Sequence, residues 1–293
     1  MRTMSVPRQR FRQWITATSA AIVVAAVLSS CGGGSRPTTT TVSGVVPTPA
    51  EQAATLAATN AYRTQIVTAA TAFNDAVRAL HDDLAAHNTT AAIAEWRRAQ
   101  AAFDTFRPEL SGGPGAWSAI GGPVDATGAG GGLHAIEFGL FHGPQSVATA
   151  ATPALVLAGA TYAIGFFRTI VQPSTIAAHQ VENLGYFVTT CLGGDPEPWS
   201  HDQILDVVAV GRGALAASAT LLPLARLVEP ATAVLFERSI NAFRASLTTI
   251  SARDGQVNQD AVRGIAAKAM ALEGVLGQLA GAFDGYTNGR YFA

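Results

Sequence analysis

Apolar residues recur at spacings of three and four along most of the chain after residue 50, and no stretch keeps the strict alternation of a half-buried strand. The first run covers residues 53–87 and predicts a long amphipathic helix. Its apolar stripe comprises Leu56, Tyr62, Ile66, Ala69, Phe73, Val77, Leu80 and Leu84. A second helix is expected from Thr89 or Thr90, either of which can cap it, to Arg107, and Pro108 ends it.

Helix signals continue to the end of the chain. Pro153 is expected to open a helix that stops before Pro173, Ser174 to cap the next, and Ser200 to form a capping box with Gln203. The predicted helices after the second are 132–141, 153–172, 174–192, 200–222, 231–252 and 257–283. Seven or eight helices joined by short turns predict an all-α fold with two helical bundles, of about four helices each, over residues 51–150 and 151–293.

A Gly-rich segment separates the second and third predicted helices. Residues 111–132 contain nine glycines and two prolines. Connections this long are usually either functional or disordered, so the segment is a candidate border of a binding site.

The first 30 residues have the pattern of a signal peptide. A start with four arginines precedes an apolar run of 14 residues, 15–28, which is shorter than the ~20 residues needed to span a bilayer. The run ends in Leu28-Ser29-Ser30-Cys31, which resembles the lipobox of bacterial lipoproteins. That resemblance implies lipidation of Cys31 and anchoring to the outer side of the cytoplasmic membrane. The alternative is an ordinary secretory signal that contains a cysteine by chance.

Composition narrows the class of protein further. Residues 31–50 are rich in Gly, Ser, Thr and Pro and are expected to form a flexible tether. With 48% hydrophobic and 13% charged residues and a net charge of −1, the chain is neither disordered nor a general nucleic-acid binder. Its two cysteines are too few for a cysteine-rich zinc site, and Cys191 is expected to pack in the core.

Candidate chemistry is concentrated in two histidine–glutamate pairs. His134 precedes Glu137 by three positions, and His179 precedes Glu182 by the same spacing. Residues three apart share a helix face, so each imidazole and carboxylate can bind one metal ion. The simpler interpretation of either pair is a surface hydrogen bond. The first pair is favoured because it follows the glycines of residues 130–132 and lies in the first turn of its predicted helix.

Gly132-Leu133-His134-Ala135-Ile136-Glu137 resembles the Gly-x-His-x-x-Glu motif of the imelysin-like family, which includes the extracytoplasmic iron-uptake proteins of the EfeO and EfeM type. The stretch Val124-Asp125-Ala126 is similar to the family's Ile-Asp-Ala, and Ala178-His179 to a region of its second bundle. The resemblance implies two helical bundles, a metal cargo of iron, or of zinc or another divalent cation, and an iron permease as partner. The ligands it implies are His134, Glu137, Asp125, His179 and Glu182.

The chain departs from this pattern at several positions. Arg107 occupies the place of a glutamate before proline, Gln180 replaces an acid, and Asn183 stands where the second glutamate is expected. The family is also classed with metallopeptidases. No His-Glu-x-x-His occurs, and the sequence names neither a third zinc ligand nor a general base, so we expect metal binding rather than hydrolysis. A non-catalytic helical scaffold lipoprotein is the remaining alternative.

Overall fold

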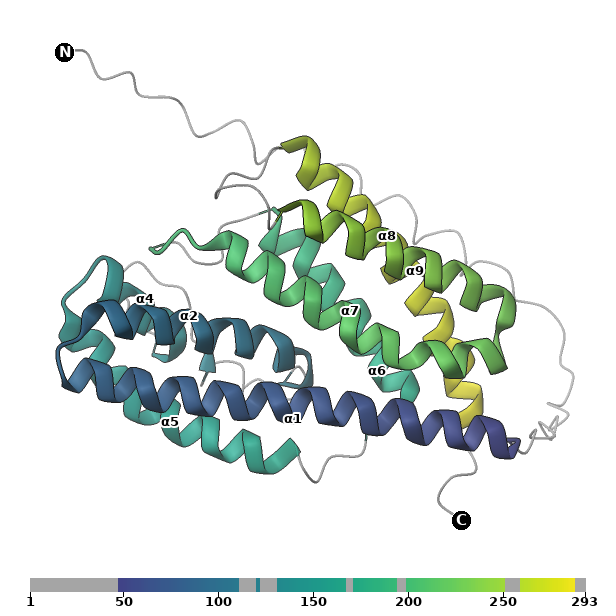
Figure 1. The fold of residues 1–293 in the computed structure, drawn as a ribbon, viewed down its shortest axis with the longest axis horizontal. Helices are drawn as coiled ribbons and strands as arrows, with labels where there is room; N and C mark the ends of the chain where they lie inside the picture. The colour runs from purple at the N-terminus through teal and green to yellow at the C-terminus, as the bar shows by residue number, and fades with distance from the viewer. Residues whose placement is uncertain are drawn as a thin grey trace, which may run out of the picture. The chain divides into compact units, whose positions relative to one another are not determined.

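The computed structural model describes residues 47–110, 120–121, 131–166, 171–193, 199–250 and 259–287, which form helices and the turns between them, with no strand (Figure 1). The all-α prediction is therefore confirmed for this part of the chain. The predicted signal peptide, Cys31, most of the tether and Asp125 lie outside the described residues. Residues Gly44–Ala293 form one compact unit.

The helices follow the sequence closely at most of their boundaries. In chain order they are α1 (Pro49–Ala85), α2 (Thr89–Phe106), the short 3₁₀ helix η1 (Arg107–Leu110), α4 (Gly132–Phe141), α5 (Gln145–Phe166), α6 (Pro173–Tyr186), the π-helical turn η2 (Phe187–Cys191), α7 (Gln203–Val228), α8 (Pro230–Ile250) and α9 (Gln259–Thr287).

Helix α1 begins with a complete capping box. The backbone amide of Glu51 donates to the Thr48 hydroxyl at 3.3 Å, and the Glu51 carboxylate accepts from the amide of Thr48 at 2.6 Å. These reciprocal bonds satisfy two amides that a helix N-terminus otherwise leaves without partners. Pro49 follows the cap at the first helical position, where its fixed φ fits the helix.

Several boundary predictions are wrong, and the reasons are local. Asn88, not Thr89 or Thr90, is the N-cap of α2, and its side chain accepts from the Ala91 amide at 3.3 Å. Pro153 lies inside α5 instead of opening it. Because proline has no backbone amide, it cannot donate to the Thr149 carbonyl, and the Thr152 hydroxyl donates to that carbonyl instead. Gln172 holds the N-cap of α6, so Ser174 is already helical. Asp202, not Ser200, occupies the N-cap of α7. That helix also continues beyond the predicted end at residue 222, through Pro223.

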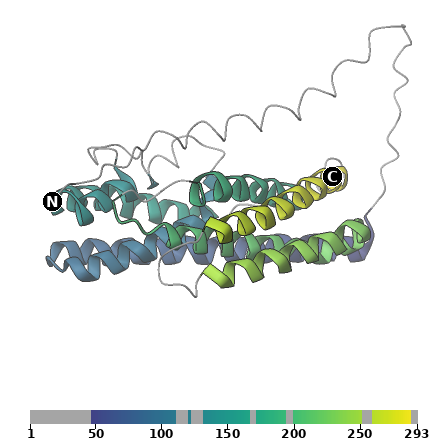
Figure 2. The same cartoon turned by 90° about the horizontal axis from the view of Figure 1, so that it is seen from above.

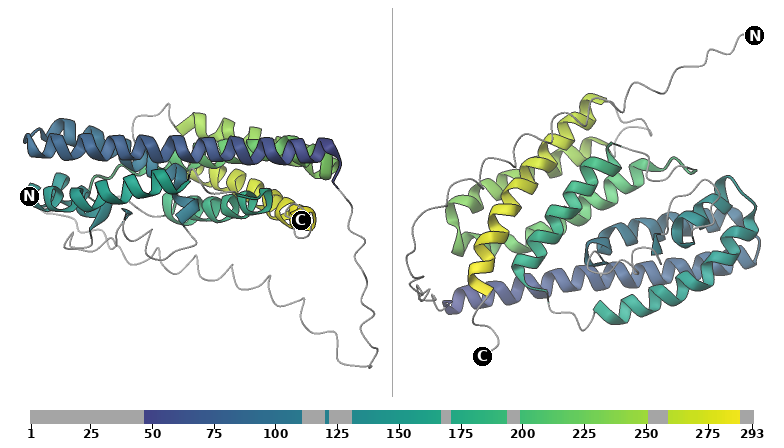
Figure 3. Two further views of the ribbon diagram at one scale, coloured as in Figure 1. Left: turned by 90° about the horizontal axis from the view of Figure 1, so that it is seen from below. Right: turned by 180° about the vertical axis from the view of Figure 1, so that it is seen from behind.

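The helices pack in one continuous arrangement (Figures 1 to 3). Helix α1 contacts α2 and α5, and α4 packs on α5. Helix α7 contacts α6 and α8, and α9 contacts α8 and α6. Helix α7 also packs against both α1 and α2. Because of these contacts, the packing does not itself divide the unit near residue 150, and the two-bundle division stays a prediction.

The core is built from aromatic and small residues. Phe106 meets Phe73 and Phe103 edge to face, with ring centroids 5.5 and 5.7 Å apart. The rings of Phe73 and Phe103 are tilted at 6.3 Å, and all three residues are buried. Cys191 is buried as well, as expected of a packing residue. In the described part of the chain, α7 is the one helix long and apolar enough to cross a membrane, and 56% of its most apolar window is buried against other helices.

Candidate functional site

Two glycines set the start of the helix that carries the motif. Gly131 and Gly132 have φ of 76° and 67°, a region that other residues rarely adopt. The turn brings the backbone amide of His134 to the carbonyl of Gly121 at 3.1 Å. The buried Trp96 indole donates to the carbonyl of Leu133 at 3.1 Å. The first turn of α4 is thus fixed from both the Gly-rich segment and α2.

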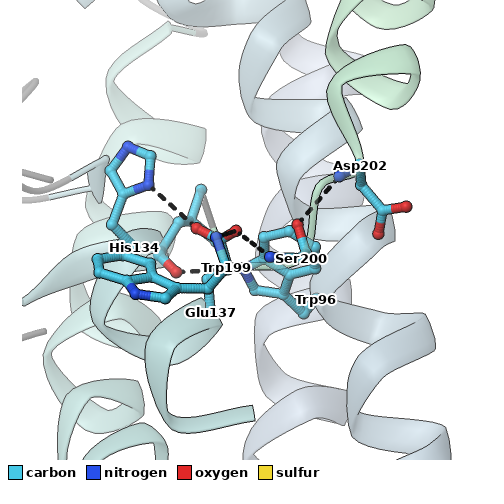
Figure 4. A network of polar contacts seen from close by, with 7 residues as sticks. Trp96, His134, Glu137, Trp199, Ser200 and Asp202 are labelled. Atoms are coloured by element: carbon cyan, nitrogen blue, oxygen red, sulfur yellow. Dashed lines mark hydrogen bonds and ion pairs between the residues drawn. The ribbon is translucent and has the colours of Figure 1, made fainter. Parts of the chain in front are cut away.

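Glu137 is the most tightly held acid of the site. Its side chain is fully buried, and Oε1 accepts from the backbone amides of Trp199 at 3.1 Å and Ser200 at 2.8 Å (Figure 4). The other oxygen, Oε2, lies 3.5 Å from Nδ1 of His134, whose side chain is 12% exposed. Glu137 therefore joins α4 to the turn before α7 and keeps one oxygen beside an imidazole.

The turn before α7 is shaped to hold this carboxylate. The Ser200 hydroxyl accepts from the amide of Asp202 at 3.3 Å, which folds residues 199–202 so that two successive amides point at Glu137 (Figure 4). The Trp199 ring packs edge to face on Phe138, with centroids 5.3 Å apart. Two adjacent amides aimed at one oxygen make a small anion-holding concavity.

A second group of buried acids lies close by. Asp104 of α2 and Asp206 in the first turn of α7 are each 1% exposed. Burial raises the pKa of Asp104 to about 7, against the lowering effects of the Arg107 charge and of short-range contacts with Asp206 and Gln100. Burial also raises the pKa of Asp206 well above its usual range, the charge of Asp104 raises it further, and that of His134 opposes the rise.

Arg107 is an internal cation within this polar region. Its guanidinium donates to Oδ1 of Asn183 at 2.7 Å and lies 3.2 Å from the centroid of the Tyr186 ring. The positive charge also acts on Asp104. Arg107 thus places a positive charge at the position where the imelysin-like pattern has a glutamate.

His179 has a different partner from the one predicted. Its Nδ1 lies 2.7 Å from Oε1 of Glu109, and the Tyr62 hydroxyl donates to the same oxygen. Burial lowers the pKa of His179, but the hydrogen bond and charge of Glu109 outweigh this, so the pKa is raised overall. Glu182 is exposed on the same helix and contributes a smaller raising effect.

Sequence reasoning missed Glu109, Asp104 and Asp206. A signal for Glu109 exists, because it follows Pro108 directly while the glutamate expected before that proline is absent. Asp104 and Asp206 are 102 positions apart in the sequence, and only the packing of α2 on α7 brings them together. Local spacing carries no signal for such a pair.

The structure brings His134 and Glu137 together and pairs His179 with Glu109. Among the described residues, no group of three or more His, Cys, Asp or Glu side chains is arranged to hold a metal ion. Asp125 lies outside the described part of the chain, and the site of five ligands stays a prediction. In comparisons with known proteins, no protein-family model and no curated protein matches this chain.

Proposed function

We propose that this chain binds a transition-metal ion, iron first among the candidates, with His134 and Glu137 as the central ligands. One observation carries the proposal. The fully buried Glu137 carboxylate is oriented by two backbone amides, while its second oxygen lies 3.5 Å from the His134 imidazole. A nitrogen and an oxygen donor are thereby held together in a fixed geometry.

The chemistry of these donors fits the cargo. Imidazole and carboxylate suit iron and zinc, and groups that hold a ligating carboxylate in place raise metal affinity because less ordering is needed on binding. The amides of Trp199 and Ser200 have that orienting role for Glu137. His134 is 12% exposed, so its ring reaches the border of the buried region where an ion would enter.

The wider proposal places this site at the cell envelope. The signal-peptide pattern and Cys31 support a lipid anchor on the outer side of the cytoplasmic membrane, with residues 31–50 as the tether. The protein would then bind iron outside the cell and present it to a membrane permease, as the resemblance to EfeO and EfeM implies. Asp125, His179 and Glu182 are the proposed additional ligands.

Calorimetric titration of ferrous, ferric and zinc ions into wild type, His134→Ala and Glu137→Gln tests the proposal. We expect each variant to weaken binding at least ~10-fold, because each removes one of only two preorganised donors. His87→Asn is the matched control, because His87 is an exposed histidine and Asn tolerates its positive φ of 58°.

Equal binding by all four proteins, or binding by none, would favour the scaffold alternative instead. Cleavage of a peptide substrate by wild type that both site variants abolish would favour the metallopeptidase.

A further inference from the structure

A set of oxygen atoms meets between α2 and the start of α7, beside the pair on α4. Gln100 and Asp104 are four positions apart on α2 and so share one helix face. Asp206 lies in the first turn of α7, which packs on α2, and interacts with both of them. The three residues are 5%, 1% and 1% exposed.

The three side chains lie close enough to act on one another, yet four of their oxygens meet no donor in good hydrogen-bond geometry within the described ranges. They are Oε1 of Gln100, Oδ2 of Asp104, and Oδ1 and Oδ2 of Asp206. A buried polar atom without a partner costs about 1–3 kcal/mol, and more when it is charged. Proteins rarely keep four such atoms in one place unless something occupies the space between them.

We propose that Gln100, Asp104 and Asp206 form an oxygen-ligand site for a hard divalent cation, of the Mg²⁺, Ca²⁺ or Mn²⁺ class, distinct from the His134–Glu137 pair. Carboxylate and amide oxygens are the donors these cations prefer, and water completes their coordination. No nitrogen or sulfur ligand belongs to the set, which separates it from a zinc-type site.

The local charge favours a cation. The set has two carboxyl groups, and the one guanidinium shown to act on it, that of Arg107, acts on Asp104 and is held by Asn183 and by the Tyr186 ring. His134 and Tyr186 are further titratable groups that interact with Asp206. A divalent cation would satisfy the four oxygens together.

Mn²⁺ added to the metal-free full-length protein, with free Mn²⁺ followed by electron paramagnetic resonance, tests this site. We expect wild type to bind Mn²⁺ and Asp206→Asn and Asp104→Asn each to bind at least ~10-fold more weakly, because each loses an anionic ligand. Both variants keep the side-chain shape, and circular dichroism checks that they fold. Asp202→Asn is the control, since Asp202 lies at the same end of α7 but pairs with Arg97 at 2.8 Å.

His134→Ala separates this proposal from the preceding one. We expect it to retain Mn²⁺ binding, whatever happens to its binding of iron. The inference is overturned if both aspartate variants bind Mn²⁺ as wild type does, if wild type binds none and holds only a proton, or if His134→Ala abolishes the binding. Unchanged iron binding by His134→Ala, with Mn²⁺ binding lost in Asp206→Asn, would refute the proposed function alone.

Discussion

Glu137 illustrates how much a single side chain contributes at the residue scale. Its burial and its two amide donors make it a structural tie as well as a candidate ligand. We expect Glu137→Ala to lower the free energy of unfolding by about 2–5 kcal/mol in the absence of metal, because two amides lose their acceptor. Glu137→Gln keeps one acceptor oxygen and is expected to cost less. Urea unfolding in the presence of chelator measures both, and equal losses would contradict this account.

The buried aspartates predict a pH dependence of stability. The folded-state pKa of Asp104, about 7, lies above its ordinary value near 3.8, so between these values the folded protein binds the extra proton. The protonated Asp104 carboxyl therefore contributes to the free energy of unfolding below about pH 4, and this contribution is lost as the pH rises toward 7. The pKa of Asp206 is raised too, with the same sign.

Asp104→Asn removes this contribution. As the pH rises from 4 to 7, we therefore expect the free energy of unfolding of the variant to increase by roughly 2–4 kcal/mol relative to that of wild type. Urea unfolding with chelator present measures this difference. Asp202→Asn, which changes a partly exposed aspartate, is expected to show no such gain. A constant difference between Asp104→Asn and wild type across this pH range would show that the carboxyl group does not hold a proton in the folded state.

Residue-scale prediction succeeded where the signal is local. The spacing of His134 and Glu137 placed both on the first turn of α4, and the structure confirms that the helix begins at Gly132. The partner of His179 could not be predicted from sequence spacing in the same way. Glu109 reaches it only because η1 and α6 pack together, and the spacing to Glu182 gave a competing local candidate.

At the scale of helices, the N-terminal cap of α1 gives a clean test. Thr48→Ala removes the hydroxyl that accepts from the amide of Glu51. We expect a loss of about 1 kcal/mol in the free energy of unfolding. Thr64→Ala, which changes an exposed threonine inside the same helix, is the control, since its hydroxyl bonds only to the Asn60 carbonyl of the preceding turn. Equal or opposite effects of the two substitutions would refute the capping role.

Close packing of α4 on α5 positions the motif. A Cβ at Gly139 would lie 2.5 Å from the backbone nitrogen of Ala148 and 2.8 Å from its Cβ. Gly139→Ala must therefore push the two helices apart, and we expect a destabilisation of about 1–3 kcal/mol together with weaker metal binding. Gly274→Ala in α9 meets no atom within 4 Å and should be neutral or stabilising. The reverse order of stabilities, measured by thermal unfolding, would contradict the packing argument.

Helix existence was easier to predict than helix ends. The apolar stripe of α1 was correct because most of its residues are buried on one side. Proline misled at Pro153 because Thr152 supplies a substitute donor and lets α5 continue. Ser200 misled at α7 because its amide and hydroxyl serve Glu137 and the turn instead of the helix end.

At the scale of the whole molecule, the sequence predicted an all-α unit but not how its helices join. Helix α7 contacts α1 and α2 as well as α6 and α8, and no periodicity within one helix indicates its partners. The nearly neutral, apolar composition indicated a large core without locating the buried polar residues inside it. Those residues depend on tertiary packing alone.

The proposed anchor is also a whole-molecule property. Cys31→Ala removes the residue that a lipobox would lipidate. We expect the variant to leave the membrane fraction or to stay unprocessed, because a peptide tether alone has no membrane affinity. Unchanged membrane fractionation together with an unchanged mass of the mature N-terminus would refute lipidation at this cysteine.

Metal content measured by mass spectrometry, on the protein purified from its membrane without chelators, tests the central claim most directly. The account predicts iron, or a related transition metal, bound to wild type and to the control His87→Asn, and absent from His134→Ala and from Glu137→Gln. Wild type that holds no stoichiometric transition metal, or equal metal in all four proteins, would contradict it.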